Sequence, residues 1–310
     1  MAIAILFPGQ GSQFRGMADA WTEHPAGDSV LQEASEAIGR DVVAGCREDQ
    51  ALSTTEFVQP ALLACDVAAS KVLEADGVTF GAAAGHSLGE FAALVSAGVL
   101  DLASALEAVV TRGRAMQIAA EQGPGTMAAL IGVGPTEATE ICEVAGRGDI
   151  LAVANENAAN QVVLSGSVAA IERAEEAARS RGVKAIRLKV AGAFHSPLMQ
   201  PAVEPIRAAL AGLEFREPRF PIVANVSGRF VGDPAAIRDG LSRHVISPVR
   251  WERSMHVLEG AGFDVFVEAG PGQVLSKLVK RELPGVRVAA VGSPREAEDF
   301  ARSISQGVVT

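Results

Sequence analysis

The stretch AAAGHSLGEF, residues 82–91, runs from small apolar residues directly into a Gly-x-Ser-x-Gly motif. In this motif a buried strand turns sharply into a helix, and the turn exposes the central serine, here Ser87. Backbones approach closely at such a turn, so Gly85 and Gly89 carry no side chain. The helix aims its N-terminal amides at the serine, and the amide of Leu88 is placed to donate to an acyl oxyanion. The stretch predicts an α/β fold with a nucleophilic serine, and a glycine-rich turn without a catalytic role is the alternative.

A nucleophilic serine needs a base, and the histidine best placed to be one is His195. The neighbours of the serine, His86 and Glu90, cannot normally fold back onto its hydroxyl. His195 follows the predicted strand 183–190, so it lies at the carboxyl end of a strand, where open α/β sheets place their chemistry. A loop histidine without a catalytic role is the alternative. No acidic residue between the serine and this histidine stands out as the group that orients it.

An arginine on an apolar helix face is the second unusual feature of the sequence. Asp101 is the predicted N-cap of a long helix that ends near Gly123. Ala105, Val109, Arg112 and Met116 follow one another at spacings of four, three and four residues, so they share one face of this helix. Arg114 points elsewhere. Arg112 either reaches the surface with its long side chain or lines a pocket that accepts a carboxylate through its bidentate fork.

The order of the predicted elements divides the chain into two parts. Residues 126–190 read strand, helix, strand, strand, helix, strand, which is the split, ferredoxin-like arrangement. This small subdomain interrupts a large domain with a parallel sheet, which we predict for residues 1–125 and 191–310. The large domain begins with the buried strand 2–7 and ends with a strand, a helix and a strand in 263–292.

Composition and charge exclude several classes of function. The chain has 310 residues, 48% of them hydrophobic, which suffices for a large core. A net charge of -10 at pH 7 argues against non-specific nucleic-acid binding. Cys46, Cys65 and Cys142 lie too far apart for a zinc knuckle and are typical of buried thiols in a reducing compartment. No apolar run reaches the roughly 18 residues of a membrane span, and no basic residues precede the apolar N-terminus, so we expect a cytoplasmic protein.

Eight short motifs along the chain resemble those of the malonyl-CoA:acyl carrier protein transacylases and of the acyltransferase domains of polyketide synthases. They are FPGQGSQ at 7–13, QPAL at 59–62, GHSLGE at 85–90, RGRAMQ at 112–117, ANENAANQVVLSG at 154–166, GAFHSPLM at 192–199, SPVRW at 247–251 and EAGPGQVL at 268–275. The resemblance covers essentially the full length. It implies an α/β-hydrolase-like large domain that carries a ferredoxin-like small subdomain.

The resemblance also implies which groups carry out the chemistry. Ser87 is the expected acylated nucleophile and His195 its base. The expected oxyanion hole consists of the backbone amides of Gln10 and Leu88. In place of a triad carboxylate, the family resemblance implies a backbone carbonyl in the SPVRW loop, here that of Arg250. Such a carbonyl fixes the tautomer of the histidine without adding charge.

Further residues are expected to bind the substrate. Arg112 matches the family arginine that pairs with the malonyl carboxylate. Phe194 resembles the bulky aromatic residue of malonyl-selective members, and Leu88 agrees with that selectivity, whereas Gly192 stands where the usual malonyl motif has histidine. Two residues of the small subdomain are expected to line the cleft, Asn157 and Gln161.

The implied activity is an acyltransferase that moves malonyl from malonyl-CoA through Ser87 to the phosphopantetheine thiol of an acyl carrier protein, in fatty acid or polyketide biosynthesis. Coenzyme A enters as a thioester substrate, and we expect no metal or bound cofactor. A thioester hydrolase of the same fold, a transacylase for substituted malonyl or carrier-bound acyl groups, and a non-catalytic acyl-holding subunit stay open as alternatives. Carrier proteins are acidic, and the basic residues predicted to dock them are Lys184, Arg187, Lys189, Lys277, Lys280 and Arg281.

Overall fold

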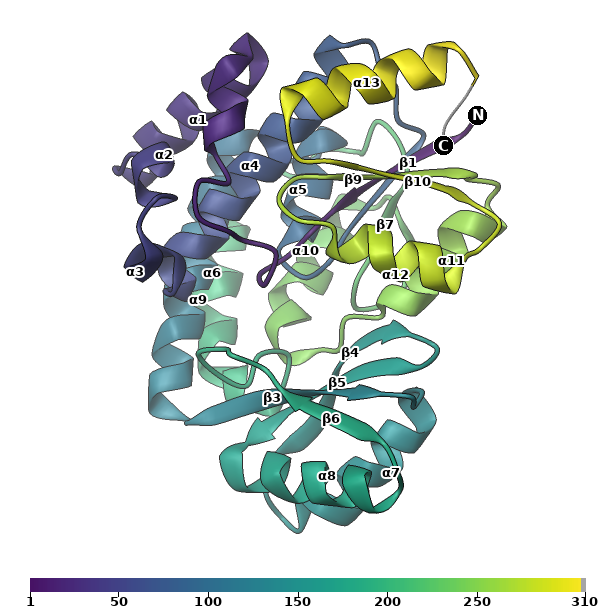
Figure 1. Ribbon diagram of the computed structural model, residues 1–310. Coiled ribbons are helices and arrows are strands. Elements are labelled where there is room, and N and C mark those ends of the chain that lie inside the picture. Colours follow the sequence, from purple (N-terminus) through teal and green to yellow (C-terminus); the bar gives the residue numbers. More distant parts are fainter. Residues whose placement is uncertain (308–310) are drawn as a thin grey trace.

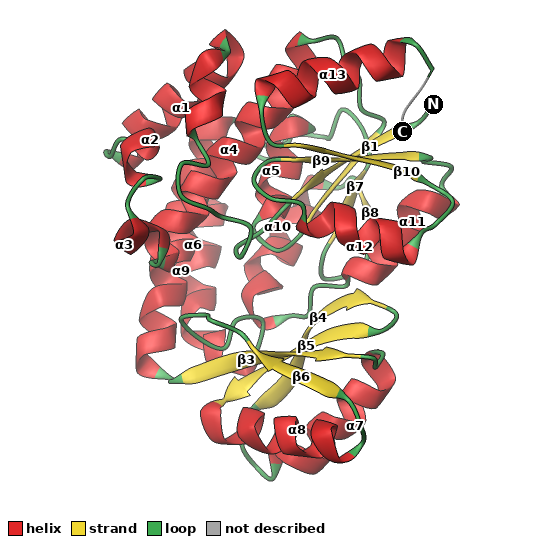
Figure 2. Cartoon of the chain, in the orientation of Figure 1, coloured by secondary structure: helices red, strands yellow, loops and turns green. Residues whose placement is uncertain are grey.

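The computed structural model describes residues 1–307 and contains two β-sheets, each covered by helices (Figures 1 and 2). The larger sheet has the strand order β10-β9-β1-β2-β7-β8. Its strands are β1 (Ile3–Phe7), β2 (Ala82–Gly85), β7 (Ile222–Ala224), β8 (Arg229–Val231), β9 (Val265–Ala269) and β10 (Arg287–Val291). All neighbouring strands are parallel except β7 and β8, which form an antiparallel pair at one edge. The prediction of a parallel α/β core is confirmed.

Strand β1 shows why this sheet is built from continuous apolar runs. Every residue of β1 is buried, because helices cover both faces of the sheet. Ile3, Ile5 and Phe7 belong to the core on one face, and Ala4 and Leu6 belong to the core on the other. The helices of the first face are α1 (Pro25–Ile38), α4 (Thr55–Ala75), α5 (Gly89–Ser96), α6 (Leu102–Gln122), α9 (Gln200–Ala211) and α13 (Pro294–Ser305). Those of the second face are α11 (Trp251–Gly260) and α12 (Val274–Glu282).

The smaller sheet is antiparallel and has the strand order β4-β5-β3-β6. Its strands are β3 (Gly125–Ile131), β4 (Leu151–Ala158), β5 (Gln161–Ser167) and β6 (Lys184–Arg187). Its helices are α7 (Pro135–Gly146) and α8 (Val168–Ser180), which cover one face of the sheet (Figure 2). Met127, Ala129 and Val163 on the other face join the core of the large domain. The element order is the predicted ferredoxin-like one, while the boundaries at 125/126 and 190/191 stay predictions.

Several elements were not predicted from the sequence. Besides α1, α11, α13 and strand β8, they are α2 (Val42–Gly45), α3 (Asp49–Leu52), α10 (Pro234–Arg243), and the 3-10 helices η1 (Asp19–Glu23) and η3 (His244–Ile246). The shortest of these helices span a single turn and are too short to show an apolar period. The helix predicted after Ser196-Pro197 is observed as η2 (Pro197–Met199) followed by α9. The strand predicted for 183–190 also ends early, at Arg187, because the chain leaves the sheet there to form the loop that carries His195.

Two expectations about the whole chain can be compared with the structure. Among residues 1–307, no helix combines the length and the hydropathy that a membrane crossing requires. All three cysteines are free, and Cys46 and Cys65 are buried as expected, whereas Cys142 is half-buried.

One buried carboxyl group lies in the core without a partner. Asp66 faces inward from α4 and is fully buried, and neither of its carboxylate oxygens has a hydrogen-bond partner within the described residues. Burial, together with the nearby Glu268, raises the pKa of Asp66 well above its usual value. The group is therefore favoured in its protonated form in the folded protein, and its cost to folding grows as the pH rises above the pKa of the unfolded chain.

We expect the variant Asp66→Ala to have a higher free energy of unfolding at pH 8, by about 1 to 3 kcal/mol, because a buried unpaired polar group is removed. The gain should be smaller at pH 4, near the unfolded pKa of about 3.9. Urea unfolding at both pH values measures this difference. Glu33→Ala, which removes an exposed carboxylate from α1, is the control. Equal gains at the two pH values would contradict the assignment.

Candidate active site

The Ser87 turn joins the end of β2 to the start of α5. Ser87 has a φ of 52°, a left-handed conformation that is uncommon for residues other than glycine. A Cβ atom on Gly85 would lie 1.9 Å from the carbonyl of Gly89, and one on Gly89 would lie 2.1 Å from the carbonyl oxygen of Phe7. Both glycines are therefore required sterically, as the motif predicts.

His195 lies on the hydroxyl of this serine. Its Nε2 is 2.8 Å from Ser87 Oγ, and its side chain is buried. Its Nδ1 lies 3.0 Å from the carbonyl oxygens of both His244 and Ser247. Carbonyls only accept hydrogen bonds, so Nδ1 carries the proton and Nε2 is left to accept the proton of Ser87.

The prediction that the carbonyl of Arg250 orients His195 is wrong. Helix α11 begins at Trp251, so the Arg250 carbonyl accepts the first hydrogen bonds of that helix, from the amide and the hydroxyl of Ser254. The carbonyls that reach the histidine belong to His244, the first residue of η3, and to Ser247, the residue that follows η3. The resemblance indicated the correct loop but the wrong residues.

Arg112 lies against the same serine hydroxyl. Its side chain is 1% exposed, which excludes the alternative that it reaches the surface. Nη2 donates to Ser87 Oγ at 3.1 Å, and Nη1 donates to Gln59 Oε1 at 2.6 Å. Burial lowers the pKa of Arg112 to about 10, and the nearby Glu90 partly opposes this shift. The guanidinium is therefore charged at neutral pH, while Arg114 lies on the surface in an ion pair with Glu56.

The predicted oxyanion donors are free to act. Across residues 1–307, neither the amide of Gln10 nor that of Leu88 donates to a protein acceptor. Leu88 is the N-cap of α5, and Gln10 lines the cavity that contains Ser87. An anionic oxygen held at the N-terminus of α5 would be stabilised by these donors and by the helix dipole.

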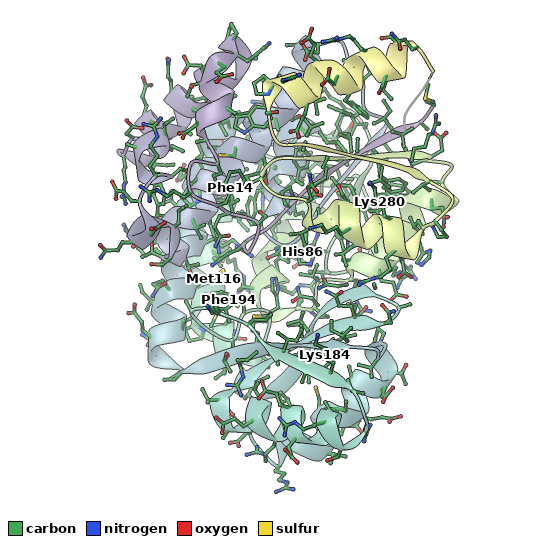
Figure 3. The ribbon with its side chains drawn as sticks, viewed as in Figure 1. Phe14, His86, Met116, Lys184, Phe194 and Lys280 are labelled. Atoms are coloured by element: carbon green, nitrogen blue, oxygen red, sulfur yellow. The ribbon has the colours of Figure 1, made fainter. Side chains whose placement is uncertain are left out.

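Two adjoining cavities open next to Ser87 where the two sheets approach each other. The first, of about 140 Å³, is lined by Gln10, Gly11, Gln13, Gln59, His86, Ser87, Met116, Met127, Asn155, Leu188, Lys189, Val190, Phe194 and His195. Figure 3 shows Met116, Phe194 and His86 gathered between the two domains. The second, of about 230 Å³, shares Gln10 and His86 with the first and extends to Asn157 and Gln161.

The predicted cleft residues Asn157 and Gln161 therefore line the neighbouring cavity and not the one at the serine. Asn157 Oδ1 lies 2.9 Å from His86 Nε2, and Gln161 Oε1 accepts from Arg281 at 2.7 Å. Phe194 lines the cavity at the serine, as predicted.

Sequence reasoning missed three polar residues of the site, Gln59, Asn225 and His244. Gln59 is 1% exposed and its Nε2 donates to Gln10 Oε1 at 3.2 Å, so it joins the arginine to the predicted oxyanion loop. A glutamine inside the apolar run of α4 was a usable signal for it. Asn225 contacts the serine turn, and His244 contacts Asn225 and His195. Both come from distant parts of the chain, and no local pattern marks them.

The predicted basic docking residues are distributed over both domains. Lys184 lies on the small domain and Lys280 on the large one (Figure 3). Arg187 is held by both oxygens of Glu175. The docking patch itself stays a prediction.

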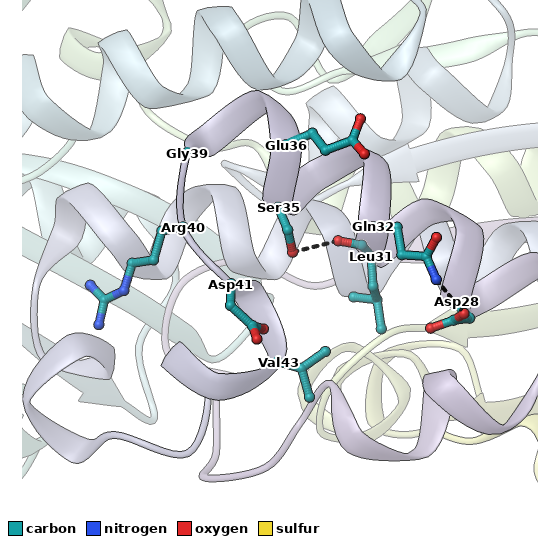
Figure 4. A pocket seen from close by; sticks show the side chains of 9 residues that line it. All are labelled: Asp28, Leu31, Gln32, Ser35, Glu36, Gly39, Arg40, Asp41 and Val43. Carbon is teal, nitrogen blue, oxygen red and sulfur yellow. Dashed lines mark hydrogen bonds between the residues drawn. The ribbon is translucent and has the colours of Figure 1, made fainter.

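Other hollows and clusters lie apart from the serine. A surface cavity of about 570 Å³ between α1 and α2 shares no residue with the Ser87 cavity (Figure 4). Within the described part of the chain, one group has the residue types for a metal, with ligand atoms within 4.8 Å of one another: Glu252, His256 and Glu282. None of these three lines either cavity next to the serine.

A serine on a strand-to-helix turn, with a histidine at its hydroxyl, is the arrangement typical of proteins that form an acyl-enzyme ester. Residues 5–306 match the family model described as the acyl transferase domain, and the chain belongs to this family. It is 40% identical over 296 residues to the malonyl CoA-acyl carrier protein transacylase of Escherichia coli (strain K12), with 94% of this chain and 96% of that protein covered. It is 38% identical over 301 residues to the transacylase of the same name from Bacillus subtilis (strain 168), with 96% and 95% covered.

Solved structures of malonyl transacylases also superpose on this chain. The malonyl CoA-acyl carrier protein transacylase from Coxiella burnetii superposes with a TM-score of 0.94 at 36% identity, covering 97% of each chain. A malonyl-transacylase solved in complex with its type II PKS acyl-carrier protein superposes with a TM-score of 0.94 at 36% identity, covering 98% of this chain and 100% of that one.

The charge of Arg112 acts on the base, and this can be measured. Burial is the main cause that lowers the pKa of His195 to about 3, and the positive charge of Arg112 is the second. The base is therefore neutral across the range from about pH 5 to about pH 8, and we expect no acid limb from it there. Removing the charge in Arg112→Gln should raise this pKa and move the acid limb to higher pH.

The measurement is the initial rate of Ser87 acylation by acetyl-CoA against pH, since acetyl has no carboxylate that depends on the arginine. Arg114→Gln, which removes an exposed guanidinium from the same helix, is the matched control. An acid limb at the same pH in wild type and Arg112→Gln would refute the electrostatic coupling.

Proposed function

We propose that this chain transfers a malonyl group from malonyl-CoA, through an ester on Ser87, to the phosphopantetheine thiol of an acyl carrier protein, in fatty acid or polyketide biosynthesis. The observation that carries the proposal is the buried guanidinium of Arg112, 3.1 Å from the nucleophilic oxygen. A buried cation beside the acylated atom favours an acyl group that carries its own carboxylate. The names of the relatives support the same substrate and acceptor.

The first half-reaction loads the enzyme. His195 Nε2 takes the proton of Ser87 Oγ while this oxygen attacks the thioester carbon of malonyl-CoA. The amides of Gln10 and Leu88 hold the oxyanion, and the carboxylate rests on Arg112. The C–S bond then breaks, the departing thiolate takes the proton from His195, and free coenzyme A leaves malonyl-Ser87 behind.

The second half-reaction transfers the malonyl group from Ser87 to the carrier protein, by the same steps in the opposite order. His195 takes the proton of the phosphopantetheine thiol, and the thiolate attacks the ester carbon. The bond to Ser87 Oγ breaks, and the proton returns from His195 to that oxygen. Both steps are exchanges of one acyl ester for another without a change of oxidation state, so we propose no resident cofactor, and coenzyme A acts only as the thioester substrate.

The size of the cavity supports malonyl over bulkier acyl groups. The cavity at Ser87 holds about 140 Å³, and the buried ring of Phe194 forms part of its wall. An acyl group with a branch on the side of this ring would contact it. We also propose a cytoplasmic location, supported by the three free cysteines, which are typical of a reducing compartment.

Replacing the guanidinium should change substrate choice. In Arg112→Ala, malonyl loading from malonyl-CoA should fall by about 3 kcal/mol or more in transition-state free energy, because a buried ion pair is lost. Acetyl loading from acetyl-CoA should fall far less, since acetyl has no carboxylate. The ratio of the two loading rates, measured by intact mass, is the readout. Equal losses for both donors would contradict the assignment of Arg112 as the residue that binds the acyl carboxylate.

The covalent intermediate and the final acceptor can be identified together. Incubation with malonyl-CoA should produce a malonyl adduct on Ser87, located by peptide mass spectrometry, and no adduct in Ser87→Ala. Adding holo acyl carrier protein should move the malonyl group to the carrier faster than free malonate appears. An unmodified serine under turnover conditions excludes the ester mechanism, and dominant release of malonate would make the protein a hydrolase.

A further inference from the structure

Both partners of the catalytic pair lie on strained backbone. Ser87 has a φ of 52° and His195 a φ of 57°, although neither is glycine. Such conformations persist only where the surroundings hold them in place. A hydrogen bond of 2.8 Å between their side chains therefore requires that two strained segments from different parts of the chain be fixed relative to each other.

Asn225 holds the first of these segments. It follows β7 directly and is 1% exposed. Its Oδ1 accepts from the amide of Ser87 at 2.7 Å, and its Nδ2 donates to the carbonyl of Gly85 at 2.6 Å. One carboxamide thus binds the backbone on both sides of His86. The two partners also fix which end of the carboxamide is oxygen and which is nitrogen.

His244 connects this carboxamide to the segment of the base. Its Nε2 lies 3.3 Å from Asn225 Oδ1, and its own carbonyl accepts from His195 Nδ1 at 3.0 Å. Glu90, on α5, also holds Asn225, because its Oε2 accepts from the backbone N–H of Asn225 at 3.1 Å. A continuous series of buried contacts therefore runs from the Ser87 backbone through Asn225 and His244 to the imidazole of His195.

We propose that Asn225 is a positioning residue that keeps Ser87 Oγ within hydrogen-bond reach of His195 Nε2, with His244 as its link to the base. This role rests on the proposed function only in that Ser87 is the nucleophile. The competing explanation is that Asn225 contributes to the stability of the fold and has no effect on the geometry of the pair.

Two substitutions separate these explanations. Asn225→Asp keeps the shape and the acceptor for Ser87 but replaces the donor to Gly85 by a second oxygen. Asn225→Ala removes both contacts. The matched control is Ser70→Ala, which breaks a buried hydroxyl pair of 3.0 Å with Ser96, since neither serine lines the cavity at Ser87.

The measurements are kcat and KM for malonyl transfer, the rate of covalent inactivation by phenylmethanesulfonyl fluoride, and the melting temperature. A misplaced reacting atom costs about tenfold to about a hundredfold in rate, and we expect losses of this size in kcat and in the inactivation rate for both Asn225 variants. KM for malonyl-CoA should stay within about twofold, because the contacts of the acyl carboxylate are untouched. Ser70→Ala should melt earlier at an unchanged inactivation rate.

The inactivation rate decides the result, because the sulfonyl fluoride needs the serine and its base but neither malonyl nor a carrier protein. Asn225 variants that melt earlier yet react with the reagent as fast as wild type would overturn the positioning role. If they do not fold, His244→Gln replaces them, since it alters the link and keeps the main-chain carbonyl. A wild-type inactivation rate in that variant would equally overturn the proposal. A wild-type protein that reacts with the reagent but transfers no malonyl would refute the proposed function alone.

Discussion

The contact between Arg112 and the Ser87 hydroxyl is the interaction on which the rest of the site depends. A guanidinium that is 1% exposed loses most of its hydration, and its Nε has no hydrogen-bond partner in the described structure. Gln59 and the buried Glu90 compensate only in part, and burial raises the pKa of Glu90 to about 7. The site therefore keeps an excess of positive charge beside its nucleophile. An acyl group with its own carboxylate would supply the negative charge that the protein does not place beside Arg112.

The two domains have separate tasks in this arrangement. The parallel sheet of the large domain builds the turn at Ser87 and directs the N-terminus of α5 at it, while α4 and α6 carry Gln59 and Arg112. The small antiparallel sheet contributes Met127 and Asn155 to the wall of the same cavity. Because the loop after β6 brings His195 back to the large domain, the base enters the site where the chain crosses from one sheet to the other.

Local patterns were sufficient wherever the decisive contacts were local. The glycine spacing predicted the turn at Ser87, the helical stripe placed Arg112 on the apolar face of its helix, and the alternation of elements predicted the small domain. Patterns failed where a partner lies far away in the chain. Asn225 is 138 residues from the Ser87 amide that it holds, and its contacts follow from strand order, which single-sequence periodicity does not contain. The carbonyls at His195 were missed for the same reason, since they belong to residues 49 and 52 positions further along the chain.

The use of carbonyls in place of a carboxylate fits the charge of the site. A carboxylate at Nδ1 would stabilise the imidazolium and would also compete for the guanidinium of Arg112. Neutral carbonyls fix the tautomer and leave the arginine free, but their hydrogen bonds only partly oppose burial and Arg112, which lower the pKa of His195 to about 3 and make it a weak base. A weak base suffices for this chemistry, because the thiolate of a thiol with a pKa of about 8.5 leaves far more easily than an amine does. A malonyl carboxylate bound to Arg112 would also cancel part of the charge that weakens His195. The correct substrate would then strengthen the base that activates the serine, and an acetyl group would not.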